Sequence, residues 1–343
     1  MVESIAMENC MRWLVTNRNL ADDGFGQDQA ELTYWTLRAP DLPVDVKSSW
    51  QQQSLDDFLN LLKTAAASFP DPRLAPSNAP RHICLFVHGY NESWQDAALL
   101  YEKVASGIFD GFDGLGELIS FDWPSAGSVL GYLPDRCAAR QTADDLTELL
   151  ENLYDHQLQM QKITAADPTQ ACRAQTSAIA HSMGNYALAY ALYQLWTRKN
   201  RPLLVSLLQQ VLMVAADVDN DLFSSGESIS NDCGEGLANL CYRITALYTG
   251  RDAVLGASAG LKHFGKRRLG RAGLDRSQPL PDNVWDVDCS NLLDPNVDGL
   301  QIHCEYFESG EKRCYNLMRA LLSGEDRTLL LRSGLAPAAL AKI

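Results

Sequence analysis

The stretch QTSAIAHSMG, residues 175–184, decides the fold of this chain. Its first six residues form a short, apolar and partly β-branched segment, which predicts a buried strand. After the stretch, apolar side chains recur at helical spacing, at Ala187, Leu188, Ala191, Leu192 and Leu195. Ser182 therefore stands on a sharp turn from a strand into a helix, whose N-terminal amides favour a developing negative charge. The small residues Ala180 and Gly184, on either side of it, allow the strand and the helix to approach closely.

A second serine, Ser258, lies in a more literal match to the same pattern, GASAG at residues 256–260. The sequence after it is basic and interrupted by glycine, which is a poor helix to bury behind such a turn. No strand of useful length leads into Ser258 either. We therefore predict that Ser182 is the nucleophile, with simple capping of a helix by Ser182 as the structural alternative.

Strand-like and helix-like segments alternate from residue 83 onward. Strand signals fall at 83–87, 116–123, 175–180, 211–216, 241–249 and 284–287. Continuous apolar runs such as 83–87 are typical of strands that are covered on both faces. The alternation predicts an α/β protein with a mainly parallel, doubly wound sheet and helices on both faces.

The N-terminal part of the chain has a different pattern. Residues 11–16 and 32–37 are strand-like, with turn residues between them, and predict an antiparallel edge of the same sheet. Nothing marks a second independent core, so we expect a single domain over residues 1–343. Residues 124–170 and 218–240 are possible cap or lid excursions.

A serine hydroxyl needs a base to remove its proton, and the base needs an acid to orient it. When a parallel α/β sheet carries its nucleophilic serine on such a strand-to-helix turn, the acid and then the histidine follow the serine along the chain. Only His263 and His303 follow Ser182. We expect His303 to be the base, because it comes after the last predicted strand and before the final predicted helix.

The acid is less sharply defined by the sequence. Asp252 stands just beyond the strand signal at 241–249 and is the expected acid. Asp217, one strand earlier, is its rival, and Asp286 and Asp288 are weaker alternatives.

Acyl transfer also needs donors for a negatively charged oxygen. The expected donors are the backbone N–H groups of Met183, directly after the nucleophile, and of Tyr90, in the loop after the strand at 83–87. Gly89 lets that loop turn tightly beside a substrate. We expect His88, which precedes Ser182, to pack beneath the loop.

Composition and charge indicate which partners and surroundings to expect for this protein. The 343 residues carry a formal net charge of −14, which disfavours nucleic acids and anionic membranes as partners. Nine cysteines without a Cys-x-x-Cys pair suggest reduced thiols in a cytoplasmic protein. No signal peptide or transmembrane segment is visible. The oligomeric state is not indicated.

No cofactor and no metal are expected. Asp217, Asp219 and Asp221 alternate as in a calcium loop, but Leu222 replaces the glycine that such a loop requires. The chain also lacks a Walker loop, a dinucleotide fingerprint and a His-Glu-x-x-His motif.

Several motifs together resemble those of the α/β-hydrolase superfamily, and within it a bacterial family of uncharacterised α/β hydrolases. They are Thr16-Asn17-Arg18, His88-Gly89-Tyr90-Asn91, Trp123-Pro124-Ser125-Ala126-Gly127, Ala180-His181-Ser182-Met183-Gly184-Asn185, Ala216-Asp217-Val218-Asp219, and the surroundings of Asp252 and His303. The resemblance implies the α/β-hydrolase fold and a Ser182–Asp252–His303 triad, and it implies no particular substrate.

These residues predict a serine hydrolase that cleaves a small-molecule carboxylic ester through an acyl-enzyme intermediate. A thioesterase, amidase or acyltransferase would use the same triad. A catalytically silent scaffold that acts as a binding module is the third alternative.

Overall fold

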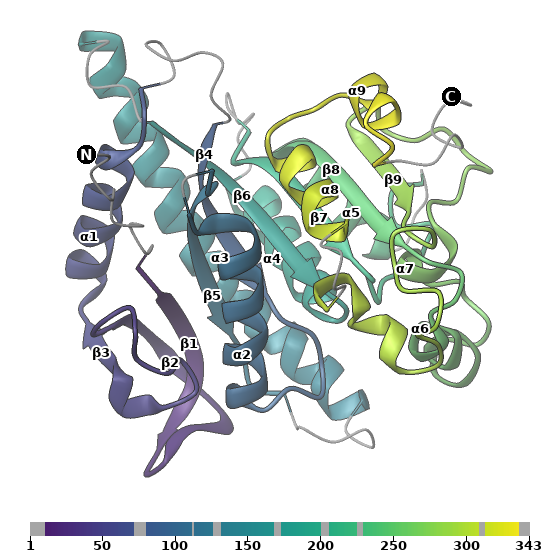
Figure 1. The fold of residues 1–343 in the computed structure, drawn as a ribbon, viewed down its shortest axis with the longest axis horizontal. Helices are drawn as coiled ribbons and strands as arrows, with labels where there is room; N and C mark the ends of the chain where they lie inside the picture. The colour runs from purple at the N-terminus through teal and green to yellow at the C-terminus, as the bar shows by residue number, and fades with distance from the viewer. Residues whose placement is uncertain are drawn as a thin grey trace, which may run out of the picture.

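The computed structural model describes residues 11–71, 80–111, 113–125, 132–167, 173–199, 206–224, 229–308 and 313–335 (Figure 1). These residues form a nine-stranded sheet in the order β3-β2-β1-β5-β4-β6-β7-β8-β9. Its strands are β1 (Trp13–Ala21), β2 (Gly24–Leu37), β3 (Trp50–Gln53), β4 (Arg81–Val87), β5 (Gly116–Asp122), β6 (Ala174–His181), β7 (Leu208–Val214), β8 (Cys241–Tyr248) and β9 (Val284–Asp288).

The sheet is parallel except at its N-terminal edge. Strand β1 pairs in parallel with β5, and every pairing from β5 across to β9 is also parallel. Strands β2 and β3 run antiparallel to their neighbours. The expected mainly parallel α/β fold with an antiparallel edge is confirmed.

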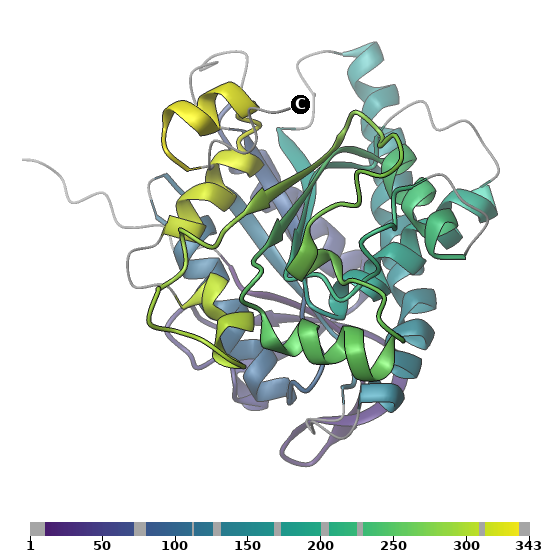
Figure 2. The ribbon, with the colours of Figure 1, turned by 90° about the vertical axis from the view of Figure 1, so that its right-hand side faces the viewer.

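Helices cover both faces of the sheet. They are α1 (Leu55–Ser68), α2 (Trp94–Val104), α3 (Tyr132–Ala166), α4 (Gly184–Lys199), α5 (Ile229–Leu240), α6 (Ala253–Ala257), α7 (Leu269–Ala272), α8 (Arg313–Leu322) and α9 (Arg327–Arg332). Helices α1, α3, α4 and α5 contribute to one hydrophobic core, and α2, α8 and α9 to the other. Figure 2 shows the yellow C-terminal helices on one side of the strands and the teal helices on the other.

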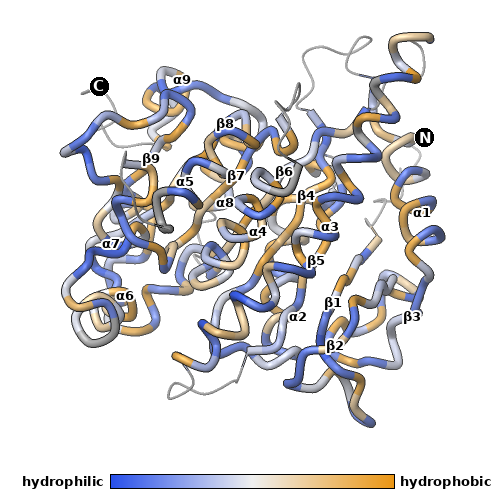
Figure 3. Tube along the Cα trace, turned by 180° about the vertical axis from the view of Figure 1, so that it is seen from behind, coloured by the Kyte–Doolittle hydropathy of each residue, from blue (hydrophilic) through white to orange (hydrophobic). Residues whose placement is uncertain are grey.

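Burial of the central strands explains their continuous apolar runs. All seven residues of β5 are buried, as are the last four of β4. In Figure 3 the middle of the sheet is orange, whereas the surrounding helices alternate between orange and blue. This is the pattern expected when strands lie between two helical layers and helices face the core on one side only.

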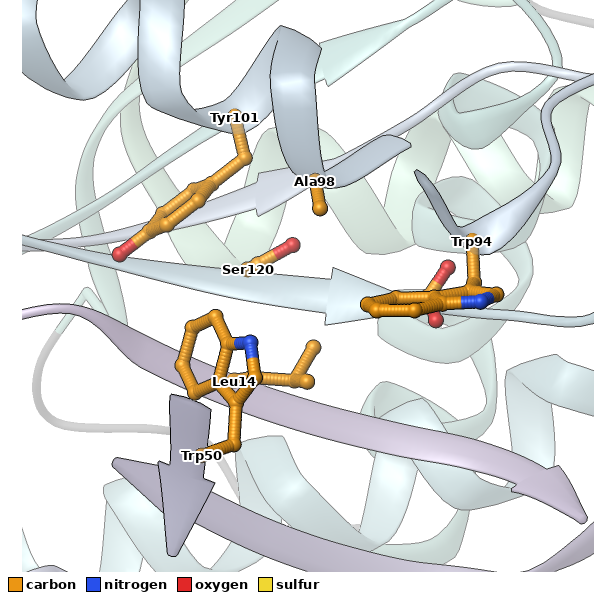
Figure 4. A pocket seen from close by; sticks show the side chains of 7 residues that line it. Leu14, Trp50, Trp94, Ala98, Tyr101 and Ser120 are labelled. Carbon is orange, nitrogen blue, oxygen red and sulfur yellow. The ribbon is translucent and has the colours of Figure 1, made fainter. Parts of the chain in front are cut away.

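A small cavity lies between α2 and the sheet. Its lining includes Trp94, Tyr101, Leu14 and Ser120 (Figure 4). The volume is about 10 Å³, which leaves room for about one water molecule. The cavity is therefore too small to bind an acyl substrate.

Strand β3 and helix α5 are among the elements that have no clear signal in the sequence. Strand β3 has only four residues, three of which are glutamines. Helix α5 falls within residues 218–240, where Gly234 and Gly236 interrupt the helical pattern. Gly236 nevertheless suits its place, because a Cβ there would lie 2.8 Å from Tyr193 Cα of the adjoining α4. Residues 126–131, 168–170 and 225–228 of the two expected excursions lie outside the described residues.

Two further properties concern membrane-spanning helices and the state of the cysteines. Within the described ranges, no helix combines the length and the apolarity needed to cross a bilayer. The seven cysteines in those ranges are free thiols, and five of them are buried.

Candidate active site

Ser182 lies on a tight turn between β6 and α4. Its backbone has φ +51°, a left-handed conformation that a non-glycine residue adopts only when its surroundings hold it there. The Ser182 amide donates to the carbonyl of Val214 on β7 at 3.0 Å. The side chain of Asn185 donates to the carbonyl oxygens of Ala180 and Ser182, at 2.9 and 3.1 Å. The turn is therefore fixed on both sides by hydrogen bonds.

The second small position of the motif requires glycine. A Cβ at Gly184 would lie 2.4 Å from the carbonyl oxygen of His88 and 2.5 Å from that of Val87. Both are backbone atoms at the end of β4, and they cannot move aside as a flexible side chain could. The first small position, Ala180, is buried and has a methyl group that fits.

The structure brings Ser182, His303 and Asp252 together from distant parts of the chain. His303 ends the short 3₁₀ turn η6 (Gln301–His303), and its Nε2 lies 2.8 Å from Ser182 Oγ. On the other side of the ring, Nδ1 lies 2.7 Å from Asp252 Oδ2. All three side chains are buried. The imidazole can thus accept the serine proton at Nε2 while Nδ1–H donates to the carboxylate.

Asp252 is held by contacts of its own. It caps the N-terminus of α6, where its Oδ1 accepts a hydrogen bond from the Leu255 amide at 2.9 Å. One carboxylate oxygen therefore orients the imidazole and the other fixes the side chain. Burial alone would lower the pKa of His303, but the charge and the hydrogen bond of Asp252, together with the charges of Asp217 and Glu92, outweigh it and raise that pKa.

His181 is a supporting residue that the sequence motifs do not single out. Its Nε2 donates to the carbonyl oxygen of His303 at 3.1 Å, and its ring packs edge-on against Phe307. Burial, together with the charges of His303 and His88, lowers the pKa of His181 to about 3. A neutral His181 therefore holds the backbone of His303. Its place directly before Ser182 is the only signal of this role in the sequence.

The loop after β4 passes directly over Ser182. A Cβ at Gly89 would lie 2.9 Å from Ser182 Cβ, so only glycine leaves room there. His88 is buried beneath this loop, as we expect, and its ring stacks on Trp123 with centroids 5.3 Å apart. Its Nε2 lies 3.0 Å from Asp122, which also pairs with Arg18. This buried network supports the loop.

Asp217 and His263, the rival acid and base, belong to a neighbouring cluster. Asp217 forms a buried ion pair with Arg268 at 2.7 Å and accepts a hydrogen bond from Tyr132 Oη at 2.8 Å. Ser258 donates to the same carboxylate at 3.0 Å, and His263 Nε2 lies 2.6 Å from Tyr132 Oη. Neither rival is in hydrogen-bonding contact with Ser182 Oγ or the His303 ring.

Asp286 and Asp288 lie elsewhere. Asp286 pairs with Arg276 at 2.6 Å, and Asp288 caps a turn by accepting from the Ser290 amide at 2.9 Å. Within the described part of the chain, no group of three or more His, Cys, Asp or Glu side chains is placed to hold a metal ion.

Comparison with known proteins assigns the chain to a family. Residues 72–312 match the family described as "Alpha/beta hydrolase of unknown function (DUF900)". The chain belongs to this α/β-hydrolase family. The match covers more than half of the sequence and includes all three residues of the Ser182–His303–Asp252 constellation. No curated protein matches the chain.

Several solved esterases and lipases are distantly similar. An esterase from Pyrobaculum calidifontis is 10% identical, over 72% of this chain and 76% of that one, with a TM-score of 0.35. A structure from work on two fungal esterases of Rhizomucor miehei is 10% identical over 93% and 85%, with a TM-score of 0.36. A hormone-sensitive lipase from a metagenome library is 16% identical over 80% and 99%, with a TM-score of 0.33.

Proposed function

We propose that this α/β-hydrolase family member is a serine hydrolase that cleaves carboxylic esters through an acyl-enzyme intermediate. The observation that carries the proposal is the hydrogen-bonded chain from Ser182 Oγ to His303 Nε2 at 2.8 Å and from His303 Nδ1 to Asp252 Oδ2 at 2.7 Å. Alcohol, imidazole and carboxylate in this order form the arrangement that activates a serine for attack on a carbonyl.

The mechanism follows from these contacts. His303 removes the proton of Ser182 as its oxygen attacks the ester carbonyl, and Asp252 stabilises the imidazolium that forms. The imidazolium then protonates the leaving alcohol, which leaves an acyl group on Ser182. Water, deprotonated by His303, attacks this acyl group, and the imidazolium returns the proton to Ser182 Oγ as the bond to the acyl group breaks and the acid leaves.

The tetrahedral intermediate needs donors for its negatively charged oxygen. We assign this role to the backbone N–H groups of Met183 and Tyr90. Within the described residues, no hydrogen bond uses the Met183 amide. The close fit of Gly89 against Ser182 Cβ supports the assignment of Tyr90, because it brings the loop that carries Tyr90 next to the reacting carbonyl.

Labelling with a fluorophosphonate probe tests the proposal directly. We expect a covalent adduct on Ser182 and turnover of short naphthyl esters. The Ser182→Ala variant should lose the adduct, and its kcat should fall by about four to six orders of magnitude.

Ser258→Ala is the matched control. Ser258 occupies the more literal copy of the motif, but its hydroxyl donates to Asp217 and, among the described residues, has no imidazole at hydrogen-bonding distance. This variant should keep both the adduct and the turnover. An intact Ser182 that takes no label, or equal labelling of Ser182→Ala, would refute the assignment.

A further inference from the structure

Two arginines of α3 stack on two tyrosines of α4, the helix that follows Ser182. The guanidinium carbon of Arg136 lies 4.0 Å from the centre of the Tyr186 ring. One turn further along both helices, Arg140 lies 5.3 Å from the centre of the Tyr190 ring. The tyrosine faces hold the guanidinium groups through cation–π contacts, which orient them but leave their N–H donors available.

Arg136 is half-buried and Arg140 is exposed, and the two guanidinium groups differ from the buried arginines of the chain in how they are paired. Neither Arg136 nor Arg140 forms an ion pair or a hydrogen bond with another residue in the part of the chain that the structure describes, and one Arg136 donor, Nη1, is buried without a partner there. A buried unpaired donor is costly in a folded protein and calls for an explanation. In a chain with a net charge of −14, two neighbouring arginines are expected to pair with acidic side chains, and these two do not pair with any in the described residues.

Contacts connect Arg136 to the nucleophile through the surrounding chain. The amide of Tyr186 donates to the carbonyl of Met183 at 2.9 Å. Tyr132, one helical turn before Arg136, donates through its hydroxyl to Asp217, whose own amide donates to the carbonyl of Ser182 at 3.1 Å. Arg136 therefore belongs to the region of α3 and α4 that adjoins the turn at Ser182.

The other charged groups of this region already have partners. Asp217 is paired with Arg268, and Asp219 is paired with Arg268 and Lys266. Asp135 accepts a hydrogen bond from the Asn91 amide at 3.2 Å. Burial and the charges of Arg268 and Arg136 lower the pKa of His263 to about 4, so His263 is neutral near pH 7. Among these described groups, Arg136 is the charged side chain without an ion pair or a hydrogen bond, although its charge helps to lower the pKa of Asp217.

We propose that Arg136, with Arg140 beyond it, binds an anionic oxygen group, a carboxylate or a phosphate, carried by the ester that Ser182 attacks. The inference rests on the proposed function, for which it names a substrate class. A planar guanidinium matches the paired oxygens of these anions, and such charge-assisted hydrogen bonds are stronger than neutral ones. The anion would pair with the guanidinium charge and fix the position of the ester.

Paired substrates test the inference. Naphthyl half-esters of succinic, glutaric and adipic acid carry a free carboxylate, and naphthyl butanoate, pentanoate and hexanoate are their neutral counterparts of equal length. We expect kcat/KM of the best half-ester to exceed that of its neutral counterpart. In Arg136→Met, the ratio of the two should fall by at least about tenfold, mainly through a higher KM for the half-ester.

Arg243→Met is the matched control. Arg243 also stacks on an aromatic ring, with its guanidinium carbon 4.0 Å from the centre of Trp285, but it lies near the start of β8, at the opposite end of that strand from Asp252. Its removal should leave the ratio unchanged. Arg136→Lys keeps a charge without the fork, and it should restore only part of the preference.

Direct binding makes the test independent of turnover. The half-esters should bind to Ser182→Ala, as measured by calorimetry, and adding Arg136→Met should raise the Kd at least about tenfold. Glutarate and inorganic phosphate, used as competitors, separate the two anions. Neutral esters cleaved as well as half-esters, or a Kd unchanged by Arg136→Met, would overturn the inference and leave the serine hydrolase intact. Loss of labelling at Ser182 would instead count against the proposed function.

Discussion

His303 is the residue whose protonation controls the proposed reaction. Its ring contacts Ser182 at Nε2 and Asp252 at Nδ1, and its backbone carbonyl accepts a hydrogen bond from His181. The raised pKa of His303 strengthens the base, because a more basic imidazole takes the serine proton more readily. It also extends to higher pH the range in which His303 is protonated and cannot accept that proton.

A pH profile should show this effect. We expect kcat/KM for a neutral ester to rise with pH along an acid limb whose midpoint lies above the usual histidine pKa of about 6.5. Asp252→Asn removes the charge that raises the pKa of His303, so the limb should move to lower pH. The maximum rate should fall by about three to four orders of magnitude, because the imidazole is no longer held in the correct tautomer.

The control for this profile is Asp286→Asn. The Asp286 carboxylate pairs with Arg276 and does not contact His303, so the limb should stay where it is. An Asp252→Asn profile with an unmoved acid limb would contradict the role that we give to Asp252.

Sequence reasoning selected the proposed reacting residues more readily than the residues that support them. Ser182 and His303 could be selected because few residue types perform this chemistry and because chain order narrows the choice. The hydrogen bond of His181 to the backbone of His303 spans 122 positions in the chain, and no local pattern records it. The choice between Asp252 and Asp217 as the acid likewise depends on Arg268, which pairs with Asp217 and not with Asp252.

At the scale of elements, the turn between β6 and α4 depends on the space available to each residue. Helix α4 begins at Gly184, a position where alanine would ordinarily favour the helix. Here the carbonyl groups of Val87 and His88 occupy the place of a Cβ. The preference of the isolated helix and the packing of the sheet therefore oppose one another at this residue.

Gly184→Ala tests which of the two dominates. We expect the free energy of unfolding to fall by about 1–3 kcal/mol, because the new methyl group forces backbone atoms apart. Urea denaturation followed by circular dichroism measures this change. At Gly260, an added methyl group would meet no atom within 4 Å, so Gly260→Ala should be neutral or stabilising by up to about 1 kcal/mol. Equal stability of Gly184→Ala and the parent protein would contradict the packing argument.

Elements with a strong pattern could be predicted, and those that depend on neighbours could not. The later parts of β4 and β7, residues 84–87 and 211–214, are covered on both faces, so their sequences are continuously apolar. Strand β3 completes the edge of the sheet through backbone pairing with β2, and its glutamine side chains carry no apolar pattern. Helix α5 contains two glycines that suit close packing and weaken the helical signal.

In the molecule as a whole, the N-terminal edge strands belong to the same sheet that carries the site. Trp13 on β1 is fully buried, its ring packs edge-on against Phe58, and its indole N–H donates to Glu117 at 2.8 Å. Apolar runs reveal which strands are buried, but they do not reveal that β1 lies next to β5. That neighbour relation emerges only from packing across the whole chain.

Trp13→Ala tests whether the edge and the site unfold together, as a single domain over residues 1–343 would require. The substitution leaves a cavity and an unpaired Glu117, and it should cost about 3–5 kcal/mol of unfolding free energy. On heating, the helical circular dichroism signal and fluorophosphonate labelling of Ser182 should disappear at the same, lowered temperature. Labelling that outlasts the loss of the spectral signal would show that the edge and the site are separate units.

The unequal demands of Ala180 and Gly184 affect how members of this fold family are recognised in genomes. A search that insists on glycine at both positions would pass over residue 182 in this chain and stop at residues 256–260, where a serine donates to Asp217. Only the later glycine is imposed by backbone atoms of another strand. Surveys that fix this glycine and accept any small residue at the earlier position should recover hydrolases that stricter patterns discard.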